Sequence, residues 1–76
     1  MPRTLKRKIK FDGSILYERR MAVGLTLQDL AKKINKTTAT LWCWEREKAE
    51  PSPKSILALA DALNTKPIKF YRKNEQ

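Results

Sequence analysis

Apolar residues recur at helical spacing along most of this chain, and short polar turns separate the repeats. The clearest stripe is Leu27, Leu30, Ala31 and Ile34, because residues three and four apart are neighbours on one helix face. The pattern predicts an all-α fold, a compact bundle of about five short helices. The expected helices span residues 14–23, 27–34, 38–47, 53–63 and 67–72.

Residues typical of helix ends flank these segments. Gly24 and Asn35 follow the first two expected helices, where the chain needs a left-handed conformation that both residue types tolerate. Asp29, at the third position of the second helix, gives a near match to a capping box. Pro53 suits the first position of the fourth helix. The expected N-caps are Ser14, Thr26, Thr37 and Ser52.

The third expected helix carries two tryptophans, which lie two residues apart and so cannot share a face. Helical periodicity places Trp44 on the core face with Leu41, and Trp42 on the opposite face. The outward face also holds Ala39, Cys43 and Arg46. An exposed tryptophan among small residues favours a partner surface. DNA is the favoured partner, and packing under the N-terminal segment or in a protein interface is the alternative.

Charge then narrows the class of partner. The 76 residues hold 17 Lys and Arg against 8 Asp and Glu, a net charge of +9 that favours a polyanion, nucleic acid first. A basic membrane-surface helix fits less well, because no segment combines a one-sided basic face with a wide apolar face. The sequence shows neither a membrane-spanning run nor a signal peptide, so we expect no membrane partner.

Side chains suited to catalysis or metal binding are scarce. The sequence contains no His, which removes the commonest general base and the commonest metal ligand, and it contains a single Cys. We therefore expect no enzyme activity, no metal and no cofactor. The lone Cys43 excludes an internal disulfide and fits a reducing compartment, so a cytoplasmic location is expected. A small apolar filler is a better interpretation of Cys43 than a redox switch.

Residues 1–13 are expected to form a basic N-terminal arm ahead of a domain over residues 14–72. One interpretation is a solvated, mobile arm, and the other is an arm that lies along a DNA backbone or enters a minor groove. Leu5, Ile9 and Phe11 alternate loosely, which leaves a short strand as a further alternative. The candidate DNA-contacting arm residues are Arg3, Lys6, Arg7, Lys8 and Lys10.

Several short motifs, taken together and in order, resemble the helix-turn-helix of the Cro/CI (Xre) repressor family. The resemblance runs from about Ser14 to Tyr71 and implies a lambda-repressor-like DNA-binding domain. Leu27 stands where the family often has Gln, and Asn35 and Glu47 stand where it usually has Gly. The matching motifs are Gly24-Leu25-Thr26, Leu30-Ala31, Ile34, Trp44-Glu45, Pro51-Ser52 and the end of the fourth helix at residues 59–63.

The resemblance also implies roles for individual residues. Residues 38–46 would form the recognition helix, which this family places in the major groove. A buried ion pair would join Arg20 to Glu45, and both residues lie on apolar faces where each charge needs the other. The implied base-reading residues are Thr38, Ala39, Trp42, Cys43 and Arg46. The implied phosphate contacts are Thr26, Gln28, Thr37, Lys48 and Lys54.

The function expected from these observations is a sequence-specific transcriptional regulator that binds double-stranded DNA. It would be a repressor of phage or mobile-element type, acting as a homodimer on a palindromic operator. The candidate dimer residues are Ile68, Phe70 and Tyr71. The alternative is a protein-interaction module, such as an antitoxin component or a coactivator, that uses the same helices on a protein.

Overall fold

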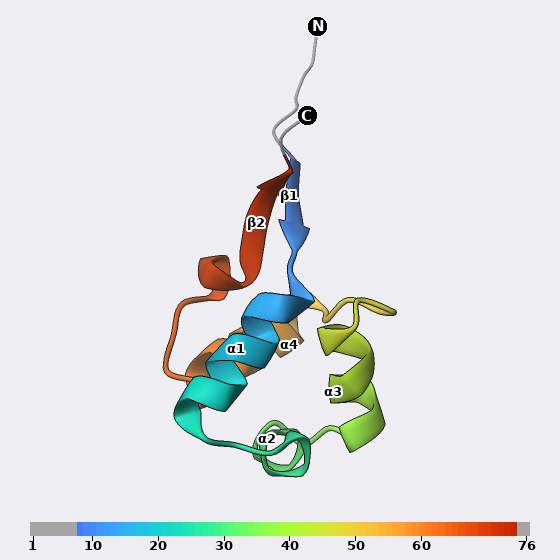
Figure 1. Cartoon of the computed structure of the whole chain (residues 1–76), viewed down its shortest axis with the longest axis vertical. Coiled ribbons are helices and arrows are strands. Elements are labelled where there is room, and N and C mark those ends of the chain that lie inside the picture. Colours follow the sequence, from blue (N-terminus) through green and yellow to red (C-terminus); the bar gives the residue numbers. More distant parts are fainter. Residues whose placement is uncertain (1–7, 75–76) are drawn as a thin grey trace, which may run out of the picture.

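The computed structural model describes residues 8–74, which form four α-helices, a 3-10 helix and a two-stranded sheet (Figure 1). Four α-helices replace the five expected, and the sheet makes the all-α expectation wrong in this detail. The helices are α1 (Gly13–Val23), α2 (Leu27–Lys33), α3 (Thr38–Glu45), α4 (Pro53–Ala62) and the 3-10 helix η1 (Pro67–Phe70), and the strands are β1 (Lys8–Phe11) and β2 (Tyr71–Asn74).

The expected fifth helix is the single turn η1, after which the chain becomes extended. Tyr71 has φ −114° and ψ 153°, and it starts β2. Antiparallel pairing with β1 aligns Phe11 with Tyr71 and Lys10 with Arg72. The pairing gives the backbone of both segments a hydrogen-bond partner that one turn of helix does not provide.

The described chain is folded from Lys8, within the segment expected to be an arm. Phe11 is buried, with 2% of its surface exposed, and its ring meets that of Tyr71 edge-on at 6.3 Å between centroids. The alternation of Ile9 and Phe11 thus marks a strand, and the folded part begins before the boundary expected at residue 13. The arm candidates Arg3, Lys6 and Arg7 lie outside the described residues.

Local capping chemistry explains where the helices begin and end. Thr26, Thr37 and Ser52 cap their helices as predicted, and Thr26 with Asp29 forms a complete capping box rather than a near match. The N-cap of α1 is Asp12 instead of Ser14, because the Ser14 N–H donates to Asp12 Oδ1 at 3.0 Å. The left-handed residues Gly24 (φ 85°), Asn35 (φ 60°), Glu47 (φ 60°) and Asn64 (φ 54°) follow the helices.

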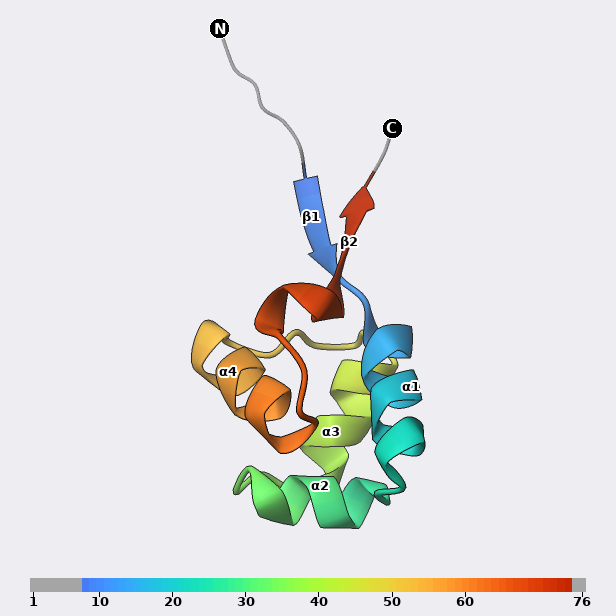
Figure 2. The ribbon, with the colours of Figure 1, turned by 90° about the vertical axis from the view of Figure 1, so that its left-hand side faces the viewer.

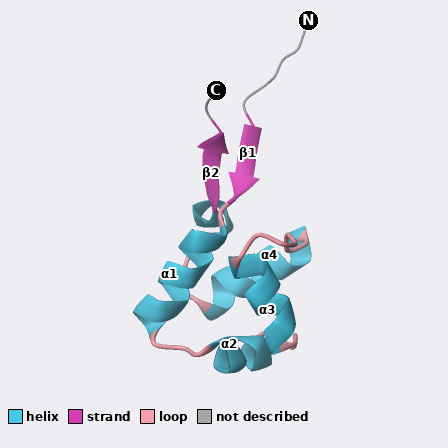
Figure 3. Ribbon diagram, turned by 45° about the vertical axis from the view of Figure 1, so that its right-hand side comes forward, coloured by secondary structure: helices cyan, strands magenta, loops and turns pink. Residues whose placement is uncertain are grey.

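A single apolar core holds the helices together. Its six largest fully buried side chains come from all four α-helices, η1 and the residue after α4: Leu16, Leu30, Leu41, Leu59, Leu63 and Phe70. Helix α3 packs against both α1 and α2. Figures 1 and 2 show the two strands projecting from the helical body at the end opposite α2. Figure 3 shows the same division into a helical body and a short strand pair.

Candidate nucleic-acid interface

A tight turn joins α2 to α3 and sets the angle between them. Asn35 adopts φ 60°, and the Lys36 N–H donates to the carbonyl of Ala31 at 2.8 Å. Thr37 then returns to extended backbone (φ −94°, ψ 158°) and caps α3 by accepting from the Thr40 N–H at 3.2 Å. Asparagine thus performs the conformational role of a turn glycine here, because its side chain tolerates the left-handed region.

The two faces of α3 separate as periodicity predicts. Leu41 is fully buried and Trp44 is 6% exposed, so both belong to the core. On the other face Trp42 is 40% exposed, and Thr38 and Ala39 are exposed as well. Cys43 is half-buried beside them as a free cysteine. The outward face of α3 is therefore open to a partner at its N-terminal half and at the indole.

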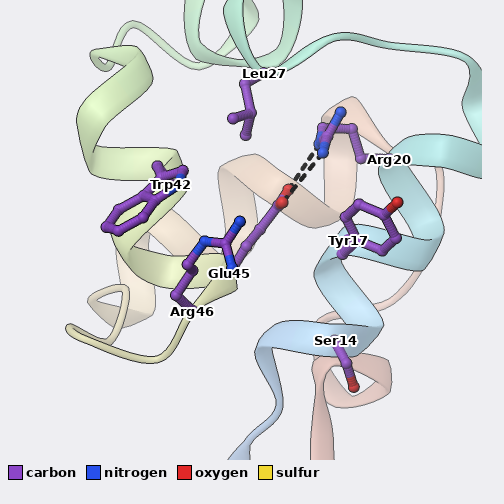
Figure 4. A pocket seen from close by; sticks show the side chains of 7 residues that line it. All are labelled: Ser14, Tyr17, Arg20, Leu27, Trp42, Glu45 and Arg46. Atoms are coloured by element: carbon purple, nitrogen blue, oxygen red, sulfur yellow. Dashed lines mark hydrogen bonds and ion pairs between the residues drawn. The ribbon is translucent and has the colours of Figure 1, made fainter.

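Trp42 and Arg46 act as a pair. The guanidinium carbon of Arg46 lies 5.0 Å from the centre of the Trp42 ring, the geometry of a cation–π contact. Both side chains line a hollow of about 410 Å³ between α1, the start of α2 and α3, shown in Figure 4. Tyr17 lies on the opposite wall, with the Arg20 guanidinium carbon 5.4 Å from its ring centre. Arg46 therefore presents its charge beside the indole.

The ion pair between Arg20 and Glu45 lines the same hollow and joins α1 to α3 (Figure 4). Arg20 Nε donates to Glu45 Oε2 at 2.7 Å, and Arg20 Nη2 donates to Oε1 at 3.1 Å, a bidentate arrangement. Arg20 Nη1 also donates to the Leu25 carbonyl at 2.9 Å. Both side chains are more than nine-tenths buried. Hydrogen bonding to the carboxylate of Glu45 raises the pKa of Arg20, so the guanidinium stays charged.

A further contact, not predicted from the sequence, attaches the start of α1 to the end of α3. The Gly13 N–H donates to Glu47 Oε2 at 2.8 Å. A Cβ on Gly13 would lie 2.6 Å from the Trp44 carbonyl oxygen and closer still to that of Glu45, so only glycine fits. The sequence gives one signal, a charged Glu47 where the family usually has glycine. The partner of that carboxylate is 34 residues away in the chain.

The predicted phosphate-contacting residues are all at the surface. Thr26, Gln28, Thr37, Lys48 and Lys54 are exposed. The Asp29 carboxylate accepts from the Thr26 N–H at 3.2 Å, and hydrogen bonds from Thr26 lower the pKa of Asp29. The Asp29 carboxylate is thus an anion already bound at the start of α2, where a phosphate would otherwise bind. The start of α3 carries no acidic residue in its first turn, so it suits a phosphate better.

The three dimer candidates have different surroundings. Ile68 is 58% exposed, and Tyr71 is half-buried against Phe11. Phe70 is fully buried and its carbonyl accepts from the Asp12 N–H at 2.8 Å, so its assignment to a dimer surface is wrong. The reason is that η1 directs the ring of Phe70 into the core beneath the strands, while Ile68 on the same turn points outward.

Residues 8–74 hold neither a membrane-spanning helix nor a cluster of metal ligands. No helix in that range has the length and apolar character of a membrane span. Nor do three His, Cys, Asp or Glu side chains of the described part of the chain gather as metal ligands would.

A capped helix pair with one outward-facing helix defines a helix-turn-helix protein, and comparison with known proteins specifies the family. The sequence signature of the helix-turn-helix family matches residues 16–70. The chain therefore belongs to the helix-turn-helix family of Xre/Cro-CI type, the DNA-binding transcription regulators that its sequence resembles. No curated protein matches the chain by sequence.

Solved structures that are similar to this chain include a restriction-modification controller and a clp gene regulator. The restriction-modification controller protein C.AhdI from Aeromonas hydrophila is 33% identical with a TM-score of 0.73, over 76% of this chain and 88% of that chain. The clp gene regulator ClgR from C. glutamicum is 27% identical with a TM-score of 0.68, over 72% of this chain and 71% of that chain.

Proposed function

We propose that this regulator binds a specific double-stranded DNA operator by placing α3 in the major groove. The observation that carries the proposal is the division of α3 into a buried face, with Leu41 and Trp44, and an exposed face that includes Thr38 and Trp42. A major groove about 12 Å wide admits one helix with its side chains. The ion pair between Arg20 and Glu45 holds that helix at a fixed angle to α1.

The exposed face of α3 favours a thymine-containing half-site. Ala39, Cys43 and the ring of Trp42 offer mainly apolar contact, and the apolar group of the major groove is the thymine methyl. Thr38 supplies a hydroxyl that donates or accepts. Arg46, held on the indole at 5.0 Å, is placed to contact a base edge or the phosphate beside it.

Basic and capping residues around this face would hold the sugar-phosphate backbone. The N-terminus of α3 presents free backbone N–H groups to an anion, next to exposed Thr37. Lys48, and Lys54 in the first turn of α4, add charge on the α4 side of α3. These contacts set the position of the protein on DNA, and the outward side chains of α3 supply the sequence preference.

The operator is proposed to be palindromic and bound by a homodimer, since one protomer reads only a few base pairs and two-fold symmetry doubles the site. Occupancy of such an operator at a promoter would exclude polymerase, the simplest action of a repressor. Similarity to a restriction-modification controller and to a clp gene regulator supports a regulatory role.

Fluorescence anisotropy with a salt series on random-sequence duplex tests the electrostatic part. The logarithm of the binding constant should fall linearly with the logarithm of salt, with a slope of about −0.9 per phosphate neutralised. A binding constant that hardly responds to salt would favour a protein-interaction module instead. Selection from a random DNA library then gives the operator, and a palindromic consensus is expected.

On the selected operator, Trp42→Ala should weaken binding by about 1–3 kcal/mol and leave random-sequence binding almost unchanged, because the indole contacts bases. Val23→Ala is the matched control, an apolar residue 48% exposed at the end of α1. Equal losses of Trp42→Ala on both DNAs would contradict base reading by Trp42.

A further inference from the structure

We infer that the β1–β2 strand pair is a second DNA-binding element, which contacts phosphates beside the bases that α3 reads. We call these two strands, residues 8–11 and 71–74, the ribbon. The inference rests on the proposed function, because it extends the same DNA contact. The ligand is the sugar-phosphate backbone, recognised by charge and independent of base sequence.

The ribbon lies outside the part of the chain that matches the family. The family signature covers residues 16–70, whereas the strands occupy residues 8–11 and 71–74. The family match therefore assigns no role to the residues of the ribbon. Of its eight residues four are Lys or Arg and none is acidic, in the sequences KIKF and YRKN.

Strand pairing sorts the ribbon into two different faces. Residues directly opposite each other share a face, and alternate residues of a strand share a face. The register pairs Lys10 with Arg72, so their two basic side chains share one face. The other face carries Phe11 and Tyr71, which pack on the core, and exposed Ile9. The face with Phe11 and Tyr71 is thus anchored on the core, and the face with Lys10 and Arg72 is polar and basic.

The start of α1, which follows β1 after Asp12, is attached to the end of the recognition helix. The Gly13 N–H bonds to Glu47 Oε2 at 2.8 Å, and Gly13 packs directly on the last carbonyls of α3. The Asp12 N–H donates to the Phe70 carbonyl at 2.8 Å, which joins the two strands where they meet the helical body. The direction of the ribbon is consequently fixed relative to α3, whose C-terminal end faces the strands (Figures 1 and 3).

Two basic side chains of the polar face are available to a phosphate. Lys10 is exposed, and the side chain of Arg72 is 52% exposed. Arg72 Nη1 also lies 3.7 Å from Asp12 Oδ2, a carboxylate oxygen at the base of the ribbon. Asp12 Oδ1 is engaged by both the backbone and the hydroxyl of Ser14. A guanidinium has five N–H donors, so that single ion pair leaves most of them for an anion.

The reach of the ribbon matches a short flank of DNA. Four residues of strand extend about 13 Å at 3.3 Å per residue. Each strand of B-DNA carries a phosphate every 3.4 Å along the axis, so this length corresponds to about four base pairs. We therefore expect phosphates just beyond the bases read by α3 to be the ones contacted.

The first test compares charge removal on the ribbon with the same removal elsewhere. Lys10→Gln with Arg72→Gln should reduce the salt slope on random-sequence duplex by about 1.8, because each of the two phosphates left without a cation accounts for about 0.9. Lys32→Gln with Lys33→Gln removes the same charge from the exposed end of α2 and should reduce the slope less. Lys10→Gln alone keeps the Arg72–Asp12 ion pair and should reduce it by about 0.9.

Equal slopes for the two double variants, or a ribbon variant that matches the unmodified chain, would overturn the inference. The inference would also be overturned if the ribbon double variant lost a dimer in sedimentation while its salt slope per protomer stayed unchanged. The ribbon would then be a protein interface. Failure of the unmodified chain to bind duplex with salt dependence is a different result, and it refutes the proposed function itself.

A second test uses DNA length. Adding about four base pairs to each end of the selected operator should strengthen binding by the unmodified chain, since the ribbon gains its phosphates. The gain should disappear in Lys10→Gln with Arg72→Gln and persist in the Lys32 and Lys33 control. The same gain in all three proteins would show that the ribbon does not touch the flank.

Discussion

At the scale of single residues, the buried charges of Arg20 and Glu45 determine how α3 is held. The sequence was sufficient to predict this pair, because two charges on apolar faces need each other and the family motif places them together. The structure adds its bidentate geometry and the extra acceptor at the Leu25 carbonyl. The contact between Gly13 and Glu47 was not predicted, because neither residue type implies its partner and the pair is distant in the chain.

The ion pair gives the first stability prediction. Glu45→Ala should lower the free energy of unfolding by about 3–5 kcal/mol, because it leaves Arg20 buried without a counter-charge. Urea unfolding followed by tryptophan fluorescence measures the loss. Glu50→Ala, at an exposed position in the loop after α3, is the control and should change stability by less than about 0.5 kcal/mol.

A combined Arg20→Met and Glu45→Leu variant separates the two possible causes of that loss. It should recover most of the stability, since two apolar side chains of similar size leave no charge unpaired. A Glu45→Ala loss of no more than about 1 kcal/mol would mean that the pair behaves as a surface ion pair and does not hold α3.

At the scale of elements, the helices were predictable and the strands only in part. Thr26, Thr37 and Ser52 mark helix starts through hydrogen bonds to residues three positions on, so their signals are local. The pairing of β1 with β2 joins residues about sixty positions apart, and alternation in one short segment does not identify its partner. The last helix is shorter than expected because Tyr71 is extended and pairs with β1. This pairing could not be predicted, because it leaves no trace in the local sequence.

Asp12 connects the strands to α1, and its ionisation should affect stability. The hydroxyl of Ser14, followed by the backbone of Ser14 and the charge of Arg72, lowers the pKa of Asp12 below its ordinary 3.8. Folding therefore favours the charged carboxylate. Its contribution is fully present above pH 3.8 and is lost as the pH falls through the lower value in the folded protein.

Two substitutions at this position test that account. Asp12→Ala should lower the free energy of unfolding by about 1 kcal/mol at pH 7, because α1 loses its cap. Asp12→Asn keeps a capping oxygen and should cost less at pH 7. Urea unfolding should show the difference between the unmodified chain and Asp12→Asn shrinking towards zero as the pH falls below 3.8. A difference that stays constant with pH would show that the charge of Asp12 does not stabilise the fold.

At the scale of the whole molecule, the distribution of exposed apolar residues bears on assembly. Ile68 in η1 and Leu57 in α4 are 58% and 61% exposed, and the two elements are in contact. Both lie outside the helix pair proposed to meet DNA. A two-fold dimer needs one self-complementary patch on each protomer, and these two exposed side chains provide apolar area without using the face of α3.

The resulting prediction concerns Ile68. Ile68→Glu should leave the melting temperature of the monomer almost unchanged, because the side chain is largely exposed, but should shift sedimentation towards monomer by placing like charges opposite each other in the dimer. Binding to the palindromic operator should weaken and lose cooperativity, while binding to a single half-site should not change. Met21→Glu, 53% exposed on α1, is the matched control. If both variants sediment as the unmodified chain does, the dimer does not form through η1, and the operator must be read either by monomers or through another surface.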